Sequence, residues 1–387
     1  MSTKHVLYLN KSGEIGGSET SLFLLLEHLD RKAYTPIVVL PQAGPFAEKL
    51  QDIHVKVILT PLRTIHWRGG NPFPYLATVF RLARIIRRER IDIVHSNNDV
   101  TNQYGAVAAR LCGVPIVCHL RDMSSRTSVR HAFLPWADQL IANSHAVAQS
   151  YLRHRPTPEE VSVIYNGVDL SEYDGCLEDG QYFRKEVGIP TGRFLLGIVG
   201  RIVAAKGHHV LIQAMARIAQ TGEDFRLVVI GPIETVSRDP YQVDQAFLAD
   251  LRKQIDSTGL SGKVTFVGAR KHMPAVYRAL DALVLPSLQE AFGRTLLEAM
   301  ATGIPVIASA VGGTPEVVEA GVAGLLVPPG DVIALAEAIL TLIRNRETAR
   351  RMGVEGRRRV ERLFDIKTNV QETERIYRRM PEPKHNQ

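Results

Sequence analysis

Cysteine is scarce in this chain, and the few cysteines form no pattern with a structural chemistry of its own. Cys112, Cys118 and Cys176 show neither a zinc-ligand spacing nor the even count of a disulfide framework. The sequence therefore excludes disulfide-rich secreted scaffolds and zinc fingers, and it favours a reducing compartment.

Long apolar runs are also missing. No stretch of about eighteen apolar residues could form a membrane-spanning helix, and the opening MSTKHVLYLN is too short and polar for a signal peptide. We therefore expect a cytoplasmic protein, with peripheral attachment to the inner face of the cell membrane as a further possibility. A D-x-D triplet, which would suggest a metal-held diphosphate, is absent too.

The remaining composition is that of an ordinary globular protein. Hydrophobic residues make up 45% and charged residues 22% of 387 residues, which is enough chain for two domains with their own cores. The net charge of +7 permits an anionic partner such as nucleic acid, a membrane surface or a phosphorylated substrate. It selects none of them, and since no nucleic-acid reader motif occurs we expect no nucleic-acid partner.

Short runs rich in Val, Ile and Leu alternate with helical patterns along the whole chain. Nearly continuous apolar runs indicate strands buried on both faces, and strand–helix alternation indicates parallel sheets with right-handed crossovers. We predict an α/β fold of two doubly wound, Rossmann-like domains, with ligands bound in a cleft beyond the carboxyl ends of the strands. The predicted strands are residues 5–10, 35–40, 54–59, 92–96, 115–120, 139–143, 194–200, 225–231, 263–268, 282–287, 305–309 and 324–329.

Each predicted domain begins with a strand, a glycine-bearing turn and a helix. In the first, LNKSGEIGGSETSLF, Gly16 and Gly17 precede a helix with Ser18 as its N-cap, which is as typical of a tight turn as of an anion site. In the second, GRIVAAKG, Arg201 and Lys206 bracket the turn. Two cations there suit a diphosphate, although solvated loop cations are the alternative.

Two carboxylates with seven residues between them, Glu290 and Glu298, occur in QEAFGRTLLEAMA. Glu290 falls on the loop after a predicted strand, whereas Glu298 falls inside the next helix. A glycosidase acid pair is one interpretation. Hydroxyl acceptors beside an anion-binding helix start are another, and the two cations favour it. The remaining alternative is that neither residue belongs to a site, so that Glu290 is an ordinary loop acid and Glu298 a charge on a helix surface.

These pieces in this order resemble the family 4 retaining glycosyltransferases, or glycosyl transferases group 1, which have the GT-B architecture. The resemblance covers essentially the whole chain and is specific as a combination. It implies an acceptor-side domain at 1–180, a nucleotide-sugar domain at 181–364, and a C-terminal helix at about 365–387 that rejoins the first domain. The matching segments are GGSETSL, NGVD, GRIVAAKG, Glu290–Glu298, VGGTPEVV and GLLVPPGD.

The resemblance also implies roles for single residues. Arg201 and Lys206 would bind the diphosphate, Glu290 the donor sugar, and Glu298 the ribose. The nucleotide base would lie near Gly268 and Arg270. Further donor contacts would come from Gly16, Gly17, Phe292, Gly293, Arg294 and Thr295. No metal and no cofactor is expected, because the nucleotide-sugar is itself the substrate.

Histidines at strand ends complete the predicted site. His119, in PIVCHLRD, resembles the family's cleft histidine near the transferred sugar and joins Arg201, Lys206 and Glu290 as a predicted catalytic residue; a buried structural histidine is its alternative. His95 and Asp122 are weaker candidates for the acceptor side. The helical pattern at 76–90 has a basic face, which is either solvated or attached to an anionic membrane that carries a lipid-linked acceptor.

The resemblance thus predicts a metal-independent retaining glycosyltransferase that acts in cell-surface polysaccharide or glycolipid biosynthesis, with a UDP-sugar as the donor expected from family frequency. A non-catalytic nucleotide-sugar-binding protein and a sugar-nucleotide epimerase of the same fold are the alternatives.

Overall fold

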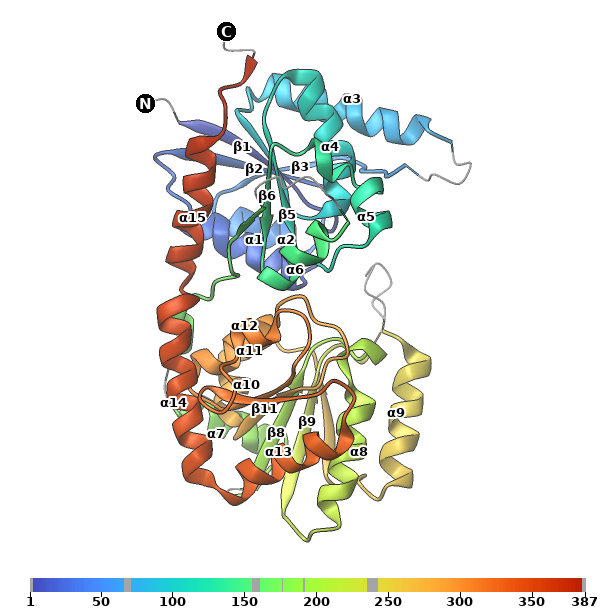
Figure 1. Ribbon diagram of the computed structural model, residues 1–387, viewed down its shortest axis with the longest axis vertical. Helices are drawn as coiled ribbons and strands as arrows, with labels where there is room; N and C mark the ends of the chain where they lie inside the picture. The colour runs from blue at the N-terminus through green and yellow to red at the C-terminus, as the bar shows by residue number, and fades with distance from the viewer. Residues whose placement is uncertain are drawn as a thin grey trace. The chain divides into compact units, whose positions relative to one another are not determined.

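The computed structural model describes residues 3–65, 71–154, 161–175, 177–190, 192–234 and 243–384. The chain forms two compact units, one of Met1–Gly167 with Ile366–Gln387 and one of Val168–Asp365 (Figure 1). The boundary expected after residue 180 falls inside helix α7 (Leu177–Glu186), which the structure assigns to the second unit.

The first unit is built on a parallel sheet of seven strands within its described residues, in the order β3-β2-β1-β4-β5-β6-β7. Six of them coincide with predicted runs. The seventh was missed, because three residues, VSV, are too few for a periodic signal. The strands are β1 (Lys4–Leu9), β2 (Tyr34–Leu40), β3 (Lys56–Leu59), β4 (Ile93–Ser96), β5 (Ile116–Leu120), β6 (Gln139–Ala142) and β7 (Val161–Val163).

Helices cover both faces of this sheet, because strand side chains alternate between the faces. On β1, Val6 and Tyr8 pack with helices α1, α2 and α15, whereas Leu7 and Leu9 pack with α3 and α4. All of these strand residues are buried. The helices are α1 (Gly17–His28), α2 (Pro45–Asp52), α3 (Phe73–Arg88), α4 (Asp99–Cys112), α5 (Arg126–His131), α6 (His145–Leu152) and α15 (Ile366–Arg379).

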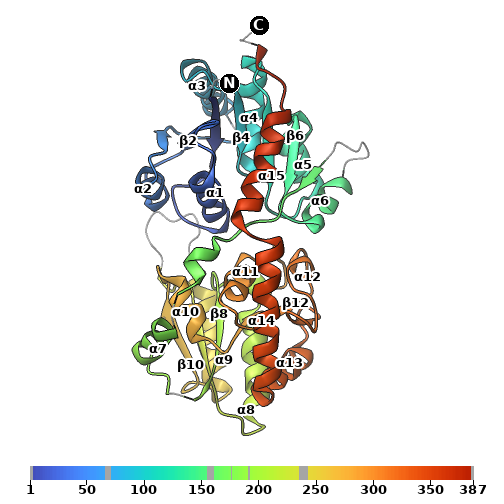
Figure 2. The same ribbon diagram turned by 90° about the vertical axis from the view of Figure 1, so that its left-hand side faces the viewer.

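Helix α15 comes from the end of the chain yet belongs to the first unit, where it lies beside α1 (Figure 2). Its apolar face contributes Ile366, Val370 and Ile376 to the core, and Tyr377 is fully buried there. Among the described helices, none is both long and apolar enough to cross a membrane.

The second unit repeats the plan with a parallel sheet that has six strands in the described residues, ordered β10-β9-β8-β11-β12-β13. The two sheets confirm the predicted doubly wound α/β class. The strands are β8 (Phe194–Val199), β9 (Phe225–Ile230), β10 (Val264–Gly268), β11 (Ala282–Leu285), β12 (Val306–Ser309) and β13 (Gly324–Val327). The helices are α7, α8 (His208–Ala219), α9 (Gln245–Ser257), α10 (Met273–Ala279), α11 (Arg294–Ala301), α12 (Thr314–Val317), α13 (Val332–Arg344) and α14 (Arg346–Leu363).

An aspartate immediately before a strand ties the amino-terminal edge of each sheet. The carboxylates of Asp92 and Asp138 accept hydrogen bonds from the amides of His5 (2.7 Å) and Ile116 (2.8 Å) on neighbouring strands. Asp281 does the same for Leu195 at 2.7 Å. These bonds occupy amides that lie at the start of a strand, where the ladder is incomplete.

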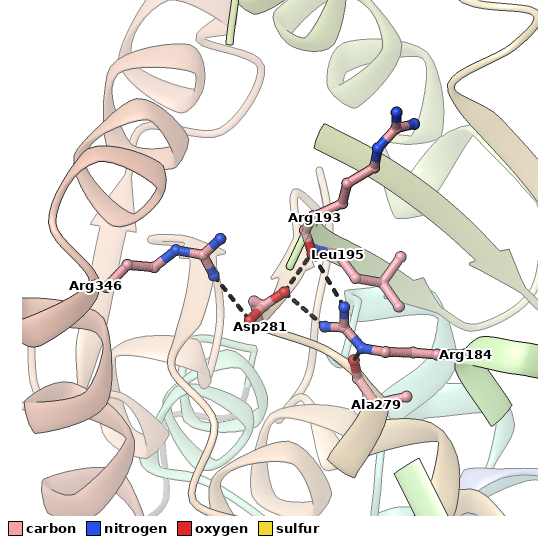
Figure 3. A network of polar contacts seen from close by, with 6 residues as sticks. All are labelled: Arg184, Arg193, Leu195, Ala279, Asp281 and Arg346. Carbon is pink, nitrogen blue, oxygen red and sulfur yellow. Dashed lines mark hydrogen bonds and ion pairs between the residues drawn. The ribbon is translucent and has the colours of Figure 1, made fainter. Parts of the chain in front are cut away.

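The Asp281 carboxylate also pairs with two arginines, so that it joins helices to the sheet (Figure 3). Arg184 of α7 donates to it at 2.7 Å and Arg346 of α14 at 2.9 Å. Arg184 donates further to the carbonyls of Ala279 and Arg193. This network fixes the base of the second sheet, at the edge opposite the predicted ligand-binding loops.

Candidate functional site

Each sheet has a topological switch point, where neighbouring strands send their connections in opposite directions. It lies between β1 and β4 in the first sheet and between β8 and β11 in the second. Doubly wound sheets bind ligands beyond the carboxyl ends of such strands. The predicted residues Arg201 and Glu290 follow β8 and β11, so the fold brings their two loops together.

Lys206 and Glu290 form the centre of the second unit's site. The Lys206 Nζ atom lies 2.6 Å from the Glu290 Oε2 atom, and the Ser287 hydroxyl donates to the same oxygen at 3.2 Å. The side chains of the ion pair are 25% and 12% exposed, so the pair is partly desolvated but within reach of a ligand. Arg201 is exposed on the loop after β8.

Two helices begin at this centre. Helix α8 starts at His208, directly after Lys206 and Gly207, and α11 starts at Arg294, directly after Gly293. Gly293 has a φ of +93°, a left-handed conformation that glycine adopts without strain. The free N–H groups of each first turn carry partial positive charge, so both helix starts favour an anion beside the lysine.

The loop that carries Glu290 is seated by a glycine from another loop. Gly312, after β12, has a φ of +56°, and a Cβ atom there would lie 1.7 Å from the Glu290 carbonyl oxygen. Only a glycine permits this approach. The segment VGG, part of the matching segment VGGTPEVV, therefore positions the loop of Glu290 through a close backbone contact.

Glu298 is held from two sides inside α11. The Tyr277 hydroxyl of α10 donates to its Oε2 atom at 2.7 Å, and the Arg294 Nε atom donates to its Oε1 atom at 2.9 Å. Thr295 lies partly buried in the same first turn. The Phe292 side chain is buried against Phe364, so only its backbone is available to a ligand.

Gly268 and Arg270 lie at the edge of the second sheet. Gly268 ends β10, the edge strand of the sheet, with a φ of +72°. Arg270 follows it and forms a 2.7 Å ion pair with Glu186 of α7, with its guanidinium over the Phe183 ring. The predicted base-binding pair thus lies two strands from β8.

In the first unit, a buried glutamate organises the glycine loop. The Glu19 carboxylate accepts hydrogen bonds from the Gly16 amide (3.2 Å) and the Ser18 hydroxyl (2.8 Å). Helix α1 therefore starts at Gly17 with Gly16 as its N-cap, and the expected N-cap role of Ser18 is wrong. Because the Gly16 amide is occupied, Gly17 is the position that offers open space to a ligand.

His95 and His119 lie on adjacent strands with their ring centres 5.8 Å apart. The His95 Nδ1 atom lies 2.6 Å from the Tyr377 hydroxyl, which donates to the Tyr8 hydroxyl at 3.0 Å. Burial, reinforced by the nearby Arg121, lowers the pKa of His95 to about 3. Burial, Arg121 and His95 together hold the pKa of His119 well below its ordinary value, so both rings are neutral.

Arg121 connects His119 to the ends of neighbouring strands. It donates to the Asn97 side chain (2.9 Å) and the Asn166 side chain (3.1 Å), and its Nη2 atom lies 3.4 Å from the His119 Nδ1 atom. A guanidinium can only donate, so Nδ1 is the acceptor and the proton is on Nε2. That Nε2 atom is buried without a hydrogen-bond partner in the described residues.

Asp122 is exposed immediately after β5. It is one of two acids at this edge, because Asp99 opens α4 at the end of β4. Burial and the nearby Asp122 raise the pKa of Asp99, while Lys11 opposes the shift. Sequence reasoning identified Asp122 but missed Asp99.

Several residues at the two switch points carried no separate signal in the sequence. The predicted residues are contacted by Tyr277, which comes from an element remote in sequence, and by Ser287 and Arg121, each of which lies between two motif positions. Only Glu19, three residues after Gly16, had a recognisable local pattern, because an acid at that position commonly bonds back to the amide before the helix.

Family comparisons account for most of the chain. Residues 15–172 match the model described as Glycosyltransferase Family 4, and residues 180–359 match that described as Glycosyl transferases group 1. The D-inositol 3-phosphate glycosyltransferase of Corynebacterium glutamicum is 32% identical over 69% of this chain and 68% of its own length. That of Catenulispora acidiphila is 33% identical, over 68% and 66%. The chain thus spans about two thirds of these relatives.

Solved structures agree on the fold. Anabaena Alr3699/HepE in complex with UDP-glucose is 28% identical, with a TM-score of 0.85 over 97% of this chain and all of that chain (100%). WaaG, a glycosyltransferase involved in lipopolysaccharide biosynthesis, is only 18% identical but has a TM-score of 0.73 over 96% and 99%. The chain has the GT-B fold, and it belongs to the group 1 glycosyltransferases of family 4, enzymes that transfer glycosyl groups.

Proposed function

We propose that this chain is a retaining glycosyltransferase that moves a sugar from a UDP-sugar to a glycan or lipid-linked acceptor in cell-surface polysaccharide or glycolipid biosynthesis. The observation that carries the proposal is the Lys206–Glu290 ion pair, which lies at the switch point of the second sheet beside the starts of α8 and α11. The UDP-glucose bound by HepE supports UDP as the nucleotide.

The cations of this site bind the diphosphate. Arg201 offers a planar fork and Lys206 a compact charge, and both suit oxygens that share a delocalised negative charge. The amides at the start of α11, around Gly293 and Thr295, add donors that need no reorganisation. The chain thereby supplies the positive charge itself, and the proposal includes neither a metal nor a cofactor.

Glu290 accepts hydrogen bonds from hydroxyls of the donor sugar. Both hydrogen bonds that its carboxylate accepts within the described residues end on Oε2, so Oε1 is the atom that receives a ligand hydroxyl. The ion pair with Lys206 offsets the negative charge of the carboxylate beside the diphosphate, where an unpaired carboxylate would repel the donor. One lysine therefore serves both the phosphate and the acid.

Transfer leaves negative charge on the departing diphosphate, and preorganised cations and amides stabilise that charge in the transition state. Retention follows from attack of the acceptor hydroxyl on the face that the diphosphate leaves, with a phosphate oxygen accepting the hydroxyl proton. His119 assists as a neutral donor, because its Nε2–H is held by the tautomer that Arg121 selects. Its low pKa makes it unsuited to act as a general acid.

The acceptor belongs to the first unit in this proposal. A cavity of about 520 Å³ is lined there by residues that include Lys11, Arg63, Thr64 and Asn71. Two cations and short polar side chains suit an acceptor that carries hydroxyls and an anionic group. The relatives' names give D-inositol 3-phosphate as one such compound to test, beside lipid-linked glycans. His95 is enclosed, so its contribution to the acceptor is indirect.

Peripheral membrane binding has a specific observation in its favour. Phe73, Leu76 and Phe80 are 73%, 41% and 66% exposed along one side of α3. Their spacing places them on one helical face, and Arg84 and Arg88 are exposed further along the same helix. An apolar stripe next to arginines suits the headgroup region of an anionic bilayer.

A donor screen tests the activity. Purified protein is offered UDP-, GDP- and ADP-sugars with candidate acceptors, while released nucleoside diphosphate, thermal protection and the anomeric configuration of the product are measured. Lys206→Ala and Glu290→Ala are expected to lose roughly a hundredfold or more in kcat. Lys253→Ala, a change at an 80% exposed lysine of α9, is the matched control.

The possible results separate the alternatives. Turnover of a UDP-sugar with a retained anomer supports the proposal. An inverted product would refute retention, and interconversion of donors without an acceptor would identify an epimerase. Stabilisation without turnover would indicate a binding protein.

Membrane binding is tested by co-sedimentation with vesicles of phosphatidylcholine alone or with phosphatidylglycerol. We expect binding only to the anionic vesicles, and its loss in Phe73→Ser/Phe80→Ser. The control is Tyr182→Ser, which changes an equally exposed aromatic residue of α7. Equal sedimentation of all three proteins would refute the α3 surface.

A further inference from the structure

Glu298 differs from an ordinary helix-surface acid in how completely it is anchored. Its two carboxylate oxygens each accept one hydrogen bond, from Tyr277 on Oε2 and from Arg294 on Oε1. The Glu298 and Arg294 side chains are only 13% and 12% exposed. A glutamate exposed on a helix surface and paired with an arginine four residues away would not need a second hydrogen-bond donor from a neighbouring helix.

Both anchoring groups donate to the carboxylate. Tyr277 is fully buried, and burial together with Glu298 itself holds the pKa of its phenol well above the ordinary value. The phenol therefore keeps its proton and donates a hydrogen bond to the carboxylate. The guanidinium of Arg294 has no acceptor atom. Glu298 consequently accepts a hydrogen bond on each of its two oxygens.

The remaining capacity of the carboxylate is well defined. An ionised carboxylate has about four acceptor positions, two on each oxygen. One position on each oxygen is used, so one on each is left, and the carboxylate plane cannot rotate without breaking a bond. Two acceptors at a fixed spacing match two adjacent hydroxyl groups.

We propose that Tyr277 and Arg294 are positioning residues that orient Glu298 toward the 2′,3′-diol of the donor nucleotide's ribose. The inference rests on the proposed function, together with the role of ribose ligand that the family resemblance implies for Glu298. It adds that recognition of the diol depends on a tyrosine of α10 that does not touch the nucleotide.

The test compares UDP with 2′-deoxy-UDP, which lacks one of the two hydroxyls. Dissociation constants of both are measured by calorimetry for the unaltered protein, Glu298→Gln and Tyr277→Phe. Tyr173→Phe is the matched control, because Tyr173 is a buried tyrosine close enough to Glu298 to feel its charge, with no hydrogen bond to it in the described residues. Arg294→Lys tests the second anchor, since it keeps the charge but loses the guanidinium fork.

We expect the unaltered protein and Tyr173→Phe to prefer UDP over its deoxy form by at least tenfold. Glu298→Gln should reduce this preference to near one. Tyr277→Phe should raise the dissociation constant of UDP by roughly tenfold, which is the contribution of one hydrogen bond to a charged group. It should change the dissociation constant of 2′-deoxy-UDP by no more than about twofold. Arg294→Lys should fall between the control and Tyr277→Phe.

The failures are distinguishable. If Glu298→Gln removes the preference and Tyr277→Phe keeps it, or weakens both nucleotides equally, the inference is wrong while the proposed function survives. If Glu298→Gln keeps the preference, or the unaltered protein binds neither nucleotide, then the proposed ribose site is refuted and the inference falls with it.

Discussion

A single methyl group at position 312 is predicted to impair transfer far more than it impairs folding. In Gly312→Ala the added Cβ would lie 1.7 Å from the Glu290 carbonyl oxygen, whereas real Cβ contacts do not fall below 3.0 Å. The difference, 3.0 − 1.7 = 1.3 Å, is the least that one loop must move. Because Glu290 is on that loop, its carboxylate moves with it.

The expected size follows from the geometry. A misplacement of about 1 Å at a reacting centre can cost about a hundredfold in rate, so we expect kcat to fall by roughly that factor. The left-handed backbone at a φ of +56° adds about 1–2 kcal/mol of strain for alanine, and this is a stability effect.

Gly321→Ala separates the two effects. Gly321 has a φ of +77°, and nothing lies within 4 Å of an added Cβ, so alanine there suffers the same backbone strain without the clash. Steady-state transfer and urea unfolding are measured for both variants. Equal kcat in Gly312→Ala and Gly321→Ala would refute the view that Gly312 seats Glu290.

Three further predictions concern stability and are measured by urea unfolding. The pKa of His95 in the folded chain, about 3, lies below its unfolded value, so lowering the pH favours the unfolded chain. The contribution of His95 to the free energy of unfolding is complete above about pH 6.5, and about 2 kcal/mol of it is lost by pH 5. His95→Gln should remove this loss. Asp281→Ala should cost about 2–3 kcal/mol of unfolding free energy, since Leu195 and two arginines lose their acceptor. Asp224→Ala, at a paired aspartate that is 55% exposed, should cost less than about 1 kcal/mol, and equal losses would contradict the network in Figure 3. Tyr377→Phe should cost about 1–3 kcal/mol by leaving the His95 Nδ1 and Tyr8 hydroxyl without their shared partner, whereas Tyr182→Phe, 73% exposed, should cost nothing measurable.

Hydrophobic runs were sufficient to predict the strands, because strands buried on both faces contain little else. A helix follows the GRIVAAKG turn as predicted, α8 (His208–Ala219), and Glu298 falls inside a helix as predicted, α11 (Arg294–Ala301). The prediction failed where a local signal was too short, as in β7, or where a tertiary bond overrode a local preference, as when Glu19 took the Gly16 amide and moved the helix start away from Ser18.

The candidate site was predictable only as a set of motif positions. The sequence placed Lys206 and Glu290 at strand-to-helix turns of one domain, and the sheet order, with β8 beside β11, brings them to 2.6 Å. It could not reveal the supporting residues. Tyr277 lies 21 residues before Glu298 on a different helix, and no spacing rule links a phenol on one helix to an acid on the next.

Helix α15 has a consequence for how the chain is made. The second unit is one continuous segment, Val168–Asp365, but the first needs Ile366–Gln387 to be complete. Until Tyr377 has left the ribosome, the Tyr8 hydroxyl and His95 lack the partner that joins them. During synthesis, therefore, the later segment can fold while the earlier one still waits for the last helix, the reverse of the usual order in which amino-terminal domains fold first.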